Sequence, residues 1–340
     1  MKNIFGYQYE ELENKLININ EKKYRARQIY EWLYAHKEYD FNKMSNIGKE
    51  TIQKLEMIFD IDFIKIKEKQ TSKLTDKYLF ELLDGNLIEA VLMKHDYGNS
   101  LCVSSQVGCN MGCSFCASGL LKTIRNLDAY EMVQQVLLAE KDLGERIDSV
   151  VIMGIGEPFN NYDNVLKFIK IINHPFGMAI GARHITVSTC GIIPKIKEFA
   201  NENIQVNLAI SLHAPNDELR SSIMKINEVY KINDLINTIK EYITKTNRRV
   251  TIEYVMLNNV NDGIKEAEEL TELLKGMNVY VNLIPYNENN SINYKKSNPD
   301  RINAFYDYLK KAGIDVTIRK EFGGNIDAAC GQLRAKEVEK

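Results

Sequence analysis

Residues 101–116 read Leu101-Cys102-Val103-Ser104-Ser105-Gln106-Val107-Gly108-Cys109-Asn110-Met111-Gly112-Cys113-Ser114-Phe115-Cys116. The run over 101–105 predicts a strand, and three cysteines follow it with C-x3-C-x2-C spacing. Soft thiolates in one loop select zinc or an iron-sulfur cluster, and three of them leave a fourth coordination position to be filled. A structural zinc site closed by a distant His or Cys is the alternative, although closed zinc sites usually show paired C-x2-C or His ligands.

The chain beyond this stretch alternates β-branched runs with amphipathic helical stretches. Such a rhythm predicts parallel strands joined by right-handed crossovers, six βα units in all, and then a short strand at 315–319. The spacing does not distinguish an open doubly wound sheet from a partial or full barrel. In either case the functional site is expected at the carboxyl ends of the strands. The expected strands lie near 101–105, 148–153, 184–189, 206–212, 250–256 and 279–284.

The chain before this stretch has a different organisation. Residues 1–60 show helical periodicity over 9–19, 24–35 and 49–59, which predicts a helical N-terminal domain. Residues 61–95 contain two β-rich runs, 77–82 and 87–92, joined by the turn signal Asp84-Gly85-Asn86. We therefore expect three parts: a helical accessory domain over 1–60, a β-hairpin linker over 61–95, and an α/β domain over 96–340.

Composition excludes several classes of protein. A chain of 340 residues with 44% hydrophobic content can fill a sizeable core, which excludes a disordered or fibrous protein. The net charge of -2 gives no global excess of positive charge, so a polyanion would be held by local patches. Apolar runs such as 150–153 are too short to cross a bilayer, and residues 1–7 do not resemble a signal peptide. Six cysteines are too few for a disulfide scaffold. A cytoplasmic protein without membrane contact is expected.

Polar residues and glycines follow several of the expected strands. A lone G-x-G is often only a tight βα turn, and a lone histidine is more often structural than functional. Here, however, they form a series at successive strand ends, where polar groups remain in contact with water. The series consists of Gly156 and Glu157, then Ser188, then Ser211, Leu212 and His213, and finally Asn287.

The cysteine motif in this βα context resembles the radical S-adenosylmethionine (SAM) superfamily. Within it, the pattern from Tyr24-Arg25-Ala26-Arg27-Gln28-Ile29 to Asp327-Ala328-Ala329-Cys330-Gly331-Gln332-Leu333 is similar to the RlmN family of radical methyltransferases. The resemblance implies a partial (βα)6 barrel. It implies that Cys109, Cys113 and Cys116 hold one [4Fe-4S] cluster whose fourth iron chelates SAM. It also implies that Gly156, Glu157, Ser188, Ser211, Leu212, His213 and Asn287 contact SAM.

The resemblance further implies methylation of C2 of an adenosine in 23S rRNA, and of one beside the anticodon in tRNA, with two SAM molecules per turnover. Cys330 would take a methyl group from the first SAM, and a radical made from the second would activate that methyl group. The family pattern gives Cys102 the role of attacking Cys330, which releases the product and leaves a transient disulfide. It gives Glu89 the role of proton acceptor, although a solvated strand carboxylate would fit the local pattern equally well. Cys190 matches no required role, and packing is its expected function.

Expected partners are the two RNA substrates and an external electron donor such as flavodoxin or ferredoxin, with the chain acting as a monomer. A run of charge is usually only a solvated face. Because the resemblance implies an RNA substrate, several basic residues of the chain are candidate phosphate contacts. They are Lys22, Lys23, Arg25, Arg27, Lys65, Lys67, Lys69, Lys73, Lys77, Arg248, Arg249, Arg319 and Arg334.

Two other functions remain open at this stage. One is methylation at C8 of adenine, as in the related Cfr-type antibiotic-resistance enzymes. Glu157-Pro158 favours C2, because the C8 enzymes tend to carry Glu-Ala at this point. The other is a zinc-stabilised RNA-binding protein without catalysis.

Overall fold

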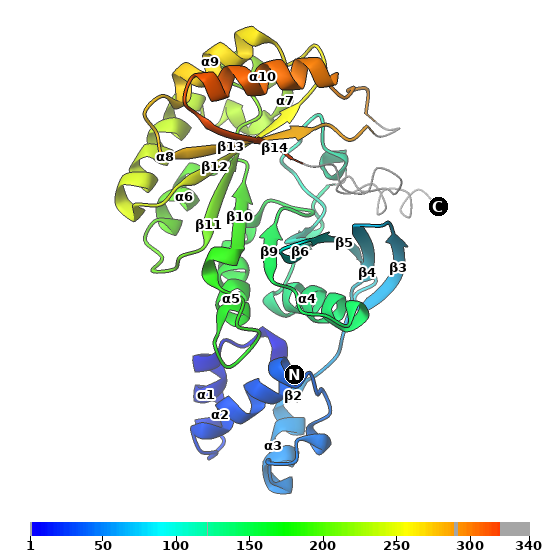
Figure 1. Cartoon of the computed structure of the whole chain (residues 1–340). Helices are drawn as coiled ribbons and strands as arrows, with labels where there is room; N and C mark the ends of the chain where they lie inside the picture. Colours follow the sequence, from blue (N-terminus) through cyan, green and yellow to red (C-terminus); the bar gives the residue numbers. More distant parts are fainter. Residues whose placement is uncertain (1, 121, 289–291, 320–340) are drawn as a thin grey trace.

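The computed structural model describes residues 2–120, 122–288 and 292–319 (Figure 1). A ten-stranded sheet runs through the molecule in the order β14-β13-β12-β11-β10-β9-β6-β5-β4-β3. The strands from β6 to β14 are parallel and lie in the order of the chain. They are β6 (Gly98–Cys102), β9 (Ser149–Ile152), β10 (Ile185–Thr189), β11 (Asn207–Ser211), β12 (Val250–Met256), β13 (Val279–Pro285) and β14 (Asp315–Ile318).

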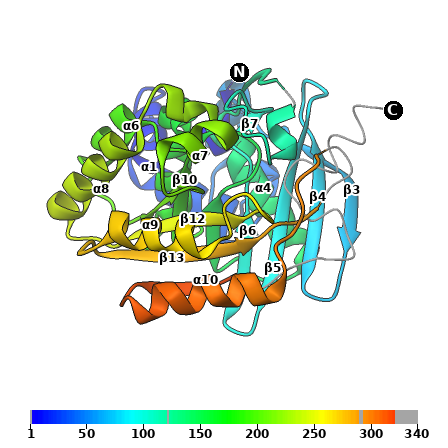
Figure 2. The same ribbon diagram turned by 90° about the horizontal axis from the view of Figure 1, so that it is seen from above.

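This strand order resolves the question of architecture. Right-handed crossovers between strands in sequential order place every helix on the same face, whereas a doubly wound sheet must reverse its order. The two outermost strands, β14 and β3, do not pair within the described part of the chain, so the sheet is an open, partial barrel. The covering helices are α4 (Ala129–Leu143), α5 (Tyr162–Asn173), α6 (Ile193–Phe199), α7 (Asp217–Ile223), α8 (Ile232–Thr246), α9 (Ile264–Leu274) and α10 (Pro299–Lys311), all labelled in Figure 1 and, apart from α5, also in Figure 2.

Helix α8 shows how the pattern produces this packing. Its buried residues Ile232, Leu235, Ile236, Ile239 and Tyr242 recur at helical spacing and form one apolar stripe against the sheet. The helix ends at Asn247, which adopts the left-handed conformation (φ 52°) and donates its N–H to the Ile243 carbonyl. The other face stays polar, as a helix on the outside of a barrel requires.

The predicted hairpin is part of the barrel sheet. Three antiparallel strands, β3 (Lys65–Thr71), β4 (Thr75–Glu81) and β5 (Leu87–His95), extend it, and β5 pairs with β6 through Val91 and Cys102. Strand β3 was not predicted, because its lysine-rich run lacks the expected apolar alternation. Strand β3 lies at the edge of the sheet, where charged residues are suited because they discourage further strand pairing.

Helices form most of the N-terminal region, as predicted. They are α1 (Tyr9–Ile17), α2 (Tyr24–Tyr30) and α3 (Lys49–Ile58). A short parallel pair, β1 (Lys2–Asn3) with β2 (Phe59–Asp60), joins the two ends of this region and was not predicted. Tyr9 of α1 stacks on His174 at the end of α5, with ring centroids 4.4 Å apart. No helix of the described residues is both long and apolar enough to span a membrane.

Candidate active site

A cavity of about 360 Å³ opens at the carboxyl ends of the parallel strands. One wall comes from β5 and the end of β6, and the others come from the cysteine loop and from the ends of β9 to β13. Most of the site residues predicted from the sequence line this single cavity: Glu89, Cys102, Cys109, Cys113, Cys116, Gly156, Glu157, Ser188, Ser211, His213 and Asn287. Residues up to about 200 positions apart in the chain therefore meet here, as parallel strand ends predict.

Two predicted residues are not seen to line the cavity. The side chain of Leu212 is fully buried in the hydrophobic core. Its backbone is nevertheless close to the site, because its N–H donates to the Glu253 carbonyl (3.1 Å) and its carbonyl accepts from Arg220 Nε (3.1 Å). Cys330 lies outside the described residues, as does Arg334, so their predicted roles rest on the sequence alone.

The three loop cysteines have the local structure expected of cluster ligands. Backbone bonds from Cys116 N–H to Cys113 O (3.1 Å) and from Gly119 N–H to Cys116 O (2.9 Å) fold the loop tightly. Gly119 permits this turn, since a Cβ there would lie 3.0 Å from the Cys113 carbonyl oxygen. Burial raises the pKa of Cys109 to about 11, with the neighbouring Cys116 adding to the rise. Burial likewise raises the pKa of Cys113, reinforced by both other thiols.

This donor set fits a [4Fe-4S] cluster. Three half-buried thiols that would repel one another as thiolates need a positively charged group between them. Within the described parts of the chain, no group of three or more His, Cys, Asp or Glu side chains is arranged to hold a single metal ion. Three thiolates in one loop leave a fourth coordination position open, which suits a [4Fe-4S] cluster with one free iron better than a closed structural zinc site.

Glu157 is a buried carboxylate tied to the backbone around it. Its Oε2 accepts from Cys190 N–H (2.8 Å) and its Oε1 from Phe159 N–H (3.0 Å), while its own N–H donates to Gln106 Oε1 (2.8 Å). Burial raises its pKa, and the two backbone donors act in the opposite direction. Gly156 beside it has φ 108° and touches Gln106, so a side chain there would clash. This strand end therefore places a carboxylate, fixed by backbone hydrogen bonds, in the cavity lining.

His213 is held as a neutral imidazole. Burial lowers its pKa to about 3, and the nearby Arg220 contributes to the lowering. Its Nδ1 accepts from Val255 N–H (3.1 Å), which leaves the proton on Nε2 as a hydrogen-bond donor. The residue has a positive φ of 61°, and the ring of Phe115 packs edge-on against it at 5.0 Å. An uncharged, fixed donor of this kind suits recognition of a bound ligand.

Comparison with known proteins identifies the family. Residues 103–274 match the radical SAM superfamily, and residues 2–61 match the ribosomal RNA large subunit methyltransferase N-terminal domain. The chain is 54% identical to the probable dual-specificity RNA methyltransferase RlmN of Acholeplasma laidlawii, over 98% of this chain and 99% of that one. The chain belongs to the RlmN family. A second member, from Thermoanaerobacter pseudethanolicus, is 50% identical over the full length of both chains.

A solved structure agrees with this assignment. The radical SAM methyltransferase from Sphaerobacter thermophilus superposes with a TM-score of 0.92 at 41% identity, covering 98% of this chain and 99% of that one. The radical SAM fold of this RlmN family member is thereby confirmed. Family membership also implies SAM and a [4Fe-4S] cluster as its cofactors, and the three loop cysteines that the cluster needs are in place.

The cavity wall formed by β5 and β6 carries two further residues that the RlmN resemblance predicts for the site. Cys102 ends β6, and burial raises the pKa of its thiol, while the charges of Arg319 and Lys77 oppose the rise. Glu89 on β5 is almost completely buried, and its Oε2 lies 3.0 Å from Lys77 Nζ. The prediction of Lys77 as a phosphate contact is wrong, because its side chain is fully buried within the protein. Lys65 and Lys67 lie on the edge strand β3 and Lys73 in the turn that follows it, where all three are exposed. Lys77 lies on β4, which is enclosed between β3 and β5 and is buried over Thr75–Phe80.

Sequence analysis missed Arg220 and Glu253. Arg220 is fully buried and donates to the carbonyls of Cys190 (2.7 Å), Leu212 (3.1 Å) and Ser211 (3.3 Å), which tie together the ends of β10 and β11. Glu253 on β12 lines the cavity and accepts from Asn282 Nδ2 (2.8 Å), and burial raises its pKa. A charged residue on a short helix or in a strand is usually exposed, so neither carried a recognisable signal.

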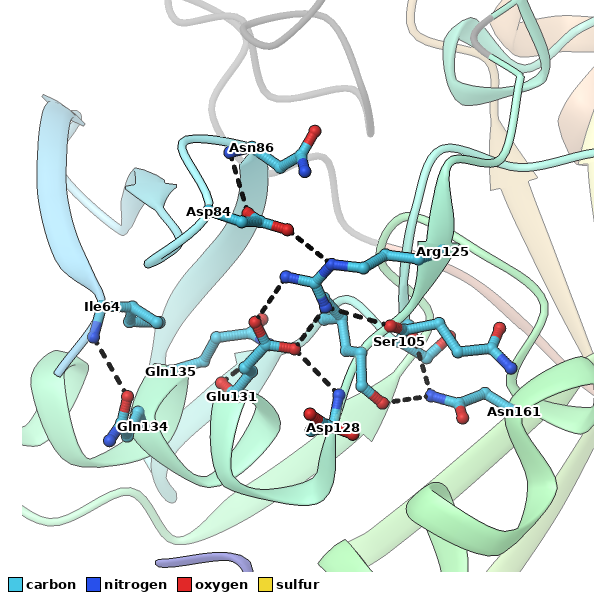
Figure 3. A network of polar contacts seen from close by, with 12 residues as sticks. Ile64, Asp84, Asn86, Ser105, Arg125, Asp128, Glu131, Gln134, Gln135 and Asn161 are labelled. Atoms are coloured by element: carbon cyan, nitrogen blue, oxygen red, sulfur yellow. Dashed lines mark hydrogen bonds and ion pairs between the residues drawn. The ribbon is translucent and has the colours of Figure 1, made fainter. Parts of the chain in front are cut away.

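Arg125 connects the cysteine loop to its surroundings. Figure 3 shows its guanidinium between Asp84 of the hairpin turn and Glu131 of α4. Nε donates to Asp84 Oδ2 (2.7 Å), and Nη1 and Nη2 donate to the two carboxylate oxygens of Glu131 (2.7 Å each). The bond from Arg125 holds the pKa of Asp84 at about 2. This double contact fixes the end of the loop between the hairpin and the barrel.

Cys190 lies closer to the site than its predicted packing role requires. It is buried in a small apolar cluster with Met224 and Val255, which fits packing, yet it also lines the cavity. Its Sγ is 3.4 Å from Met111 Sδ in the cysteine loop. Its burial is consistent with the expected packing role, and the surface that it packs against is the loop of the predicted cluster ligands.

Proposed function

We propose that this chain is a radical SAM methyltransferase that methylates C2 of an adenosine in 23S rRNA and of an adenosine beside the anticodon in tRNA. The observation that carries the proposal is the joint presence of Glu89, Cys102 and the three loop cysteines around one cavity. The similar proteins named above are called dual-specificity RNA methyltransferases, which supports both substrates. The chain would work as a monomer, with flavodoxin or ferredoxin as electron donor.

The loop cysteines would hold one [4Fe-4S] cluster, and the strand ends would hold SAM. When bound, the cluster supplies the electron that splits SAM into methionine and a 5'-deoxyadenosyl radical, and it accepts the electron that the RNA adduct later loses. Glu157 offers its buried carboxylate to the SAM ammonium group, and Ser188, Ser211, His213 and Asn287 supply polar contacts on the same wall. Gly156 gives the ligand close access to the backbone.

The two catalytic cysteines divide the transfer into steps. The Cys330 thiolate displaces the methyl group from a first SAM, which leaves as S-adenosylhomocysteine. The radical from the second SAM removes one hydrogen atom from this S-methyl group, and the resulting methylene radical bonds to the adenine carbon. Loss of one electron and of the proton on that carbon, which Glu89 accepts, gives a stable thioether between enzyme and RNA.

Release requires Cys102. Its sulfur attacks the Cys330 sulfur, the carbon–sulfur bond of the thioether breaks, and the Cys102 proton ends on the methylene carbon to complete the methyl group. The enzyme is left with a Cys102–Cys330 disulfide, which a thiol reductant must open before the next turnover. Cys102 lies on the cavity wall beside Glu89, a place that suits both the proton transfer and the attack.

The N-terminal region would serve as an RNA-binding accessory domain over residues 1–60. The predicted phosphate contacts differ in their availability. Lys23 pairs with Glu13 (3.0 Å), Arg27 with Glu31 (2.8 Å), and Lys69 with Asp142 (2.6 Å). The cations of the first two pairs are exposed, and such pairs are weak, so Lys23 and Arg27 would be available to a phosphate. Lys69 is held more firmly, because its Nζ also lies 3.4 Å from the buried Asp76. Arg319 lines the cavity itself, so it would act near the target nucleotide. The target base must leave its stack to enter the cavity.

An anaerobic assay tests this function. The reconstituted protein is incubated with SAM labelled in its methyl group, a reductant and RNA fragments from 23S rRNA and tRNA, and the methyl position is located by mass spectrometry. Methyl at C2 supports the proposal, whereas methyl at C8 reassigns the chain to the Cfr-type reaction. Cys102→Ala should accumulate a covalent RNA adduct, and Cys330→Ala should lose methylation of the enzyme itself. Colourless protein with bound zinc and no 5'-deoxyadenosine would refute catalysis.

A further inference from the structure

Asn261 is a fully buried amide in the loop between β12 and α9, and both ends of its side chain are hydrogen-bonded. Its Oδ1 accepts from Leu257 N–H (2.7 Å). Its Nδ2 donates to the carbonyls of His213 (2.8 Å) and Val255 (2.6 Å). Only Oδ1 can accept from an N–H and only Nδ2 can donate to two carbonyls, so these partners define the orientation of the amide.

The two bonds from Nδ2 close a circuit around His213. Val255, whose carbonyl accepts from Asn261, also donates its own N–H to His213 Nδ1 (3.1 Å). One amide group therefore holds both the backbone of His213 and the residue that orients its imidazole ring. The N–H of His213 donates to Glu253 O (3.2 Å). Among the described residues, Nε2–H is then the polar group of His213 that has no protein partner, and His213 lines the cavity.

The bond to His213 is not needed to fold the loop of Asn261. The partners Leu257 and Val255 lie four and six positions away in the chain, whereas His213 lies 48 positions away and follows a different strand. His213 has a positive φ of 61°. A left-handed conformation is unfavourable for a residue with a side chain and persists only where the surroundings hold it. The long-range bond from Asn261 is made to the carbonyl of this strained residue.

Asn261 is itself anchored on two sides. The buried Tyr254 of β12 donates its OH to Asn261 O (2.7 Å). The next residue, Asp262, is also buried, and its Oδ1 accepts from Asn259 N–H (3.0 Å) and from Nη2 of Arg301 on α10 (2.6 Å). Because the loop is fixed in this way, the amide of Asn261 can impose a defined position on His213.

We propose that Asn261 is a positioning residue that holds His213 in its left-handed conformation and directs its Nε2–H toward bound SAM. The inference rests on the proposed function, in which His213 contacts SAM at the strand ends. It assigns part of the SAM affinity to a loop residue that is not among the described residues lining the cavity. A donor that is fixed before the ligand arrives needs no ordering on binding, which strengthens the complex.

Two variants separate this role from the local structure of the loop. Asn261→Leu removes every hydrogen bond of the side chain at similar volume. Asn261→Asp keeps an acceptor for Leu257 N–H but replaces the donor with an oxygen that faces the two carbonyls. Both substitutions are made in the wild-type chain and in a His213→Ala background, so that each forms a double-mutant cycle with His213.

Asn161→Leu in the same two backgrounds is the matched control. Asn161 is also buried, and its Nδ2 also donates to two backbone carbonyls, those of Ser105 (2.9 Å) and Leu127 (2.7 Å). These bonds hold the segments around residues 105 and 127 rather than His213. Equilibrium dialysis of labelled SAM against each reconstituted holoenzyme measures affinity, at about pH 8 to favour the carboxylate of Asn261→Asp. Urea unfolding of each variant measures stability.

We expect both Asn261 variants to weaken SAM binding by about tenfold when His213 is present, and by less than about twofold when it is alanine. The imidazole through which Asn261 acts is absent in the second background. Any effect of Asn161→Leu on SAM affinity should be the same in both backgrounds. A role of Asn261 in stability alone would lower the free energy of unfolding without this dependence on residue 213.

Equal losses of SAM affinity in the two backgrounds, or no loss in either Asn261 variant, would overturn the proposal. Unchanged SAM affinity in His213→Ala would overturn it as well. If Asn261→Leu fails to fold, Asn261→Asp decides alone. Failure of the wild-type holoenzyme to bind SAM or to methylate RNA would instead refute the proposed function and this inference with it, so the two failures are distinguishable.

Discussion

Replacing Arg220 by Met should destabilise the protein and weaken SAM binding together. The guanidinium is fully buried and donates to three backbone carbonyls and to Asn227 Oδ1 (3.1 Å). Methionine fills much of the same volume but donates nothing, so the carbonyls of Cys190 and Leu212 lose a buried partner. Each buried carbonyl left without a partner lowers the stability by about 1–3 kcal/mol. Methionine carries no charge, so the variant no longer pays for burying one, and this offsets part of the loss. We expect a net loss of about 3 kcal/mol.

The ligand effect follows from the position of these carbonyls. They end β10 and β11, the strands that carry Ser188 and Ser211 on the cavity wall. Loosening both ends should reduce SAM affinity by about tenfold, which corresponds to about 1.4 kcal/mol. Urea unfolding followed by circular dichroism measures the stability, and equilibrium dialysis of labelled SAM against the reconstituted holoenzyme measures the affinity.

A second arginine, which contacts the other end of β11, serves as a control for the general effect of losing an arginine. Arg248, which contacts β11 near its other end, donates to Ile204 O (3.1 Å) and Asn207 Oδ1 (3.4 Å) and is only half-buried. Arg248→Met should cost less than about 1 kcal/mol and leave SAM affinity unchanged. Equal stability of Arg220→Met and wild type, or an equal loss of SAM affinity in both variants, would refute this reasoning.

Three further predictions concern other parts of the site. The folded protein holds the pKa of His213 at about 3, so the unfolded state binds more protons than the folded state below about pH 6.5. The free energy of unfolding should therefore fall by about 2 kcal/mol as the pH is lowered from 7 to 5. Urea unfolding at each pH measures this decrease, and the His213→Gln variant should lack it. Gly154→Ala places a Cβ 2.7 Å from the backbone of Val103 and should lower the free energy of unfolding in urea by about 2 kcal/mol. Gly48→Ala is the control and should be neutral, because nothing lies within 4 Å of its Cβ. Equal losses in the two variants would contradict the packing argument. Arg125→Met should free the end of the cysteine loop and increase the rate of iron loss to a chelator, and an unchanged rate would show that the loop is held by other contacts.

Local sequence was sufficient for the features that depend on short-range geometry. The spacing of Cys109, Cys113 and Cys116 places three thiols in one loop whatever the rest of the fold does. The stripe of α8 and the alternation of strands and helices follow from periodicity in the same way. The residues of the predicted series from Gly156 to Asn287, apart from Leu212, line one cavity, because parallel strands place their carboxyl ends at a common edge.

Tertiary structure decided which charges are buried. Lys77 belongs to a run of lysines that is typical of a solvated face, and only the pairing of β4 with β5 shows that it points inward against Glu89. Arg220 sits on a short helix that would pass as exposed, yet it crosses beneath two strand ends. The cost of burying a charge depends on which partners the fold brings within hydrogen-bond distance, and those partners lie on other strands and loops. A short stretch of sequence does not show which distant residues will become these partners. The cysteine motif was therefore sufficient to predict the chemistry, whereas the buried charged residues around the site became apparent only from the fold.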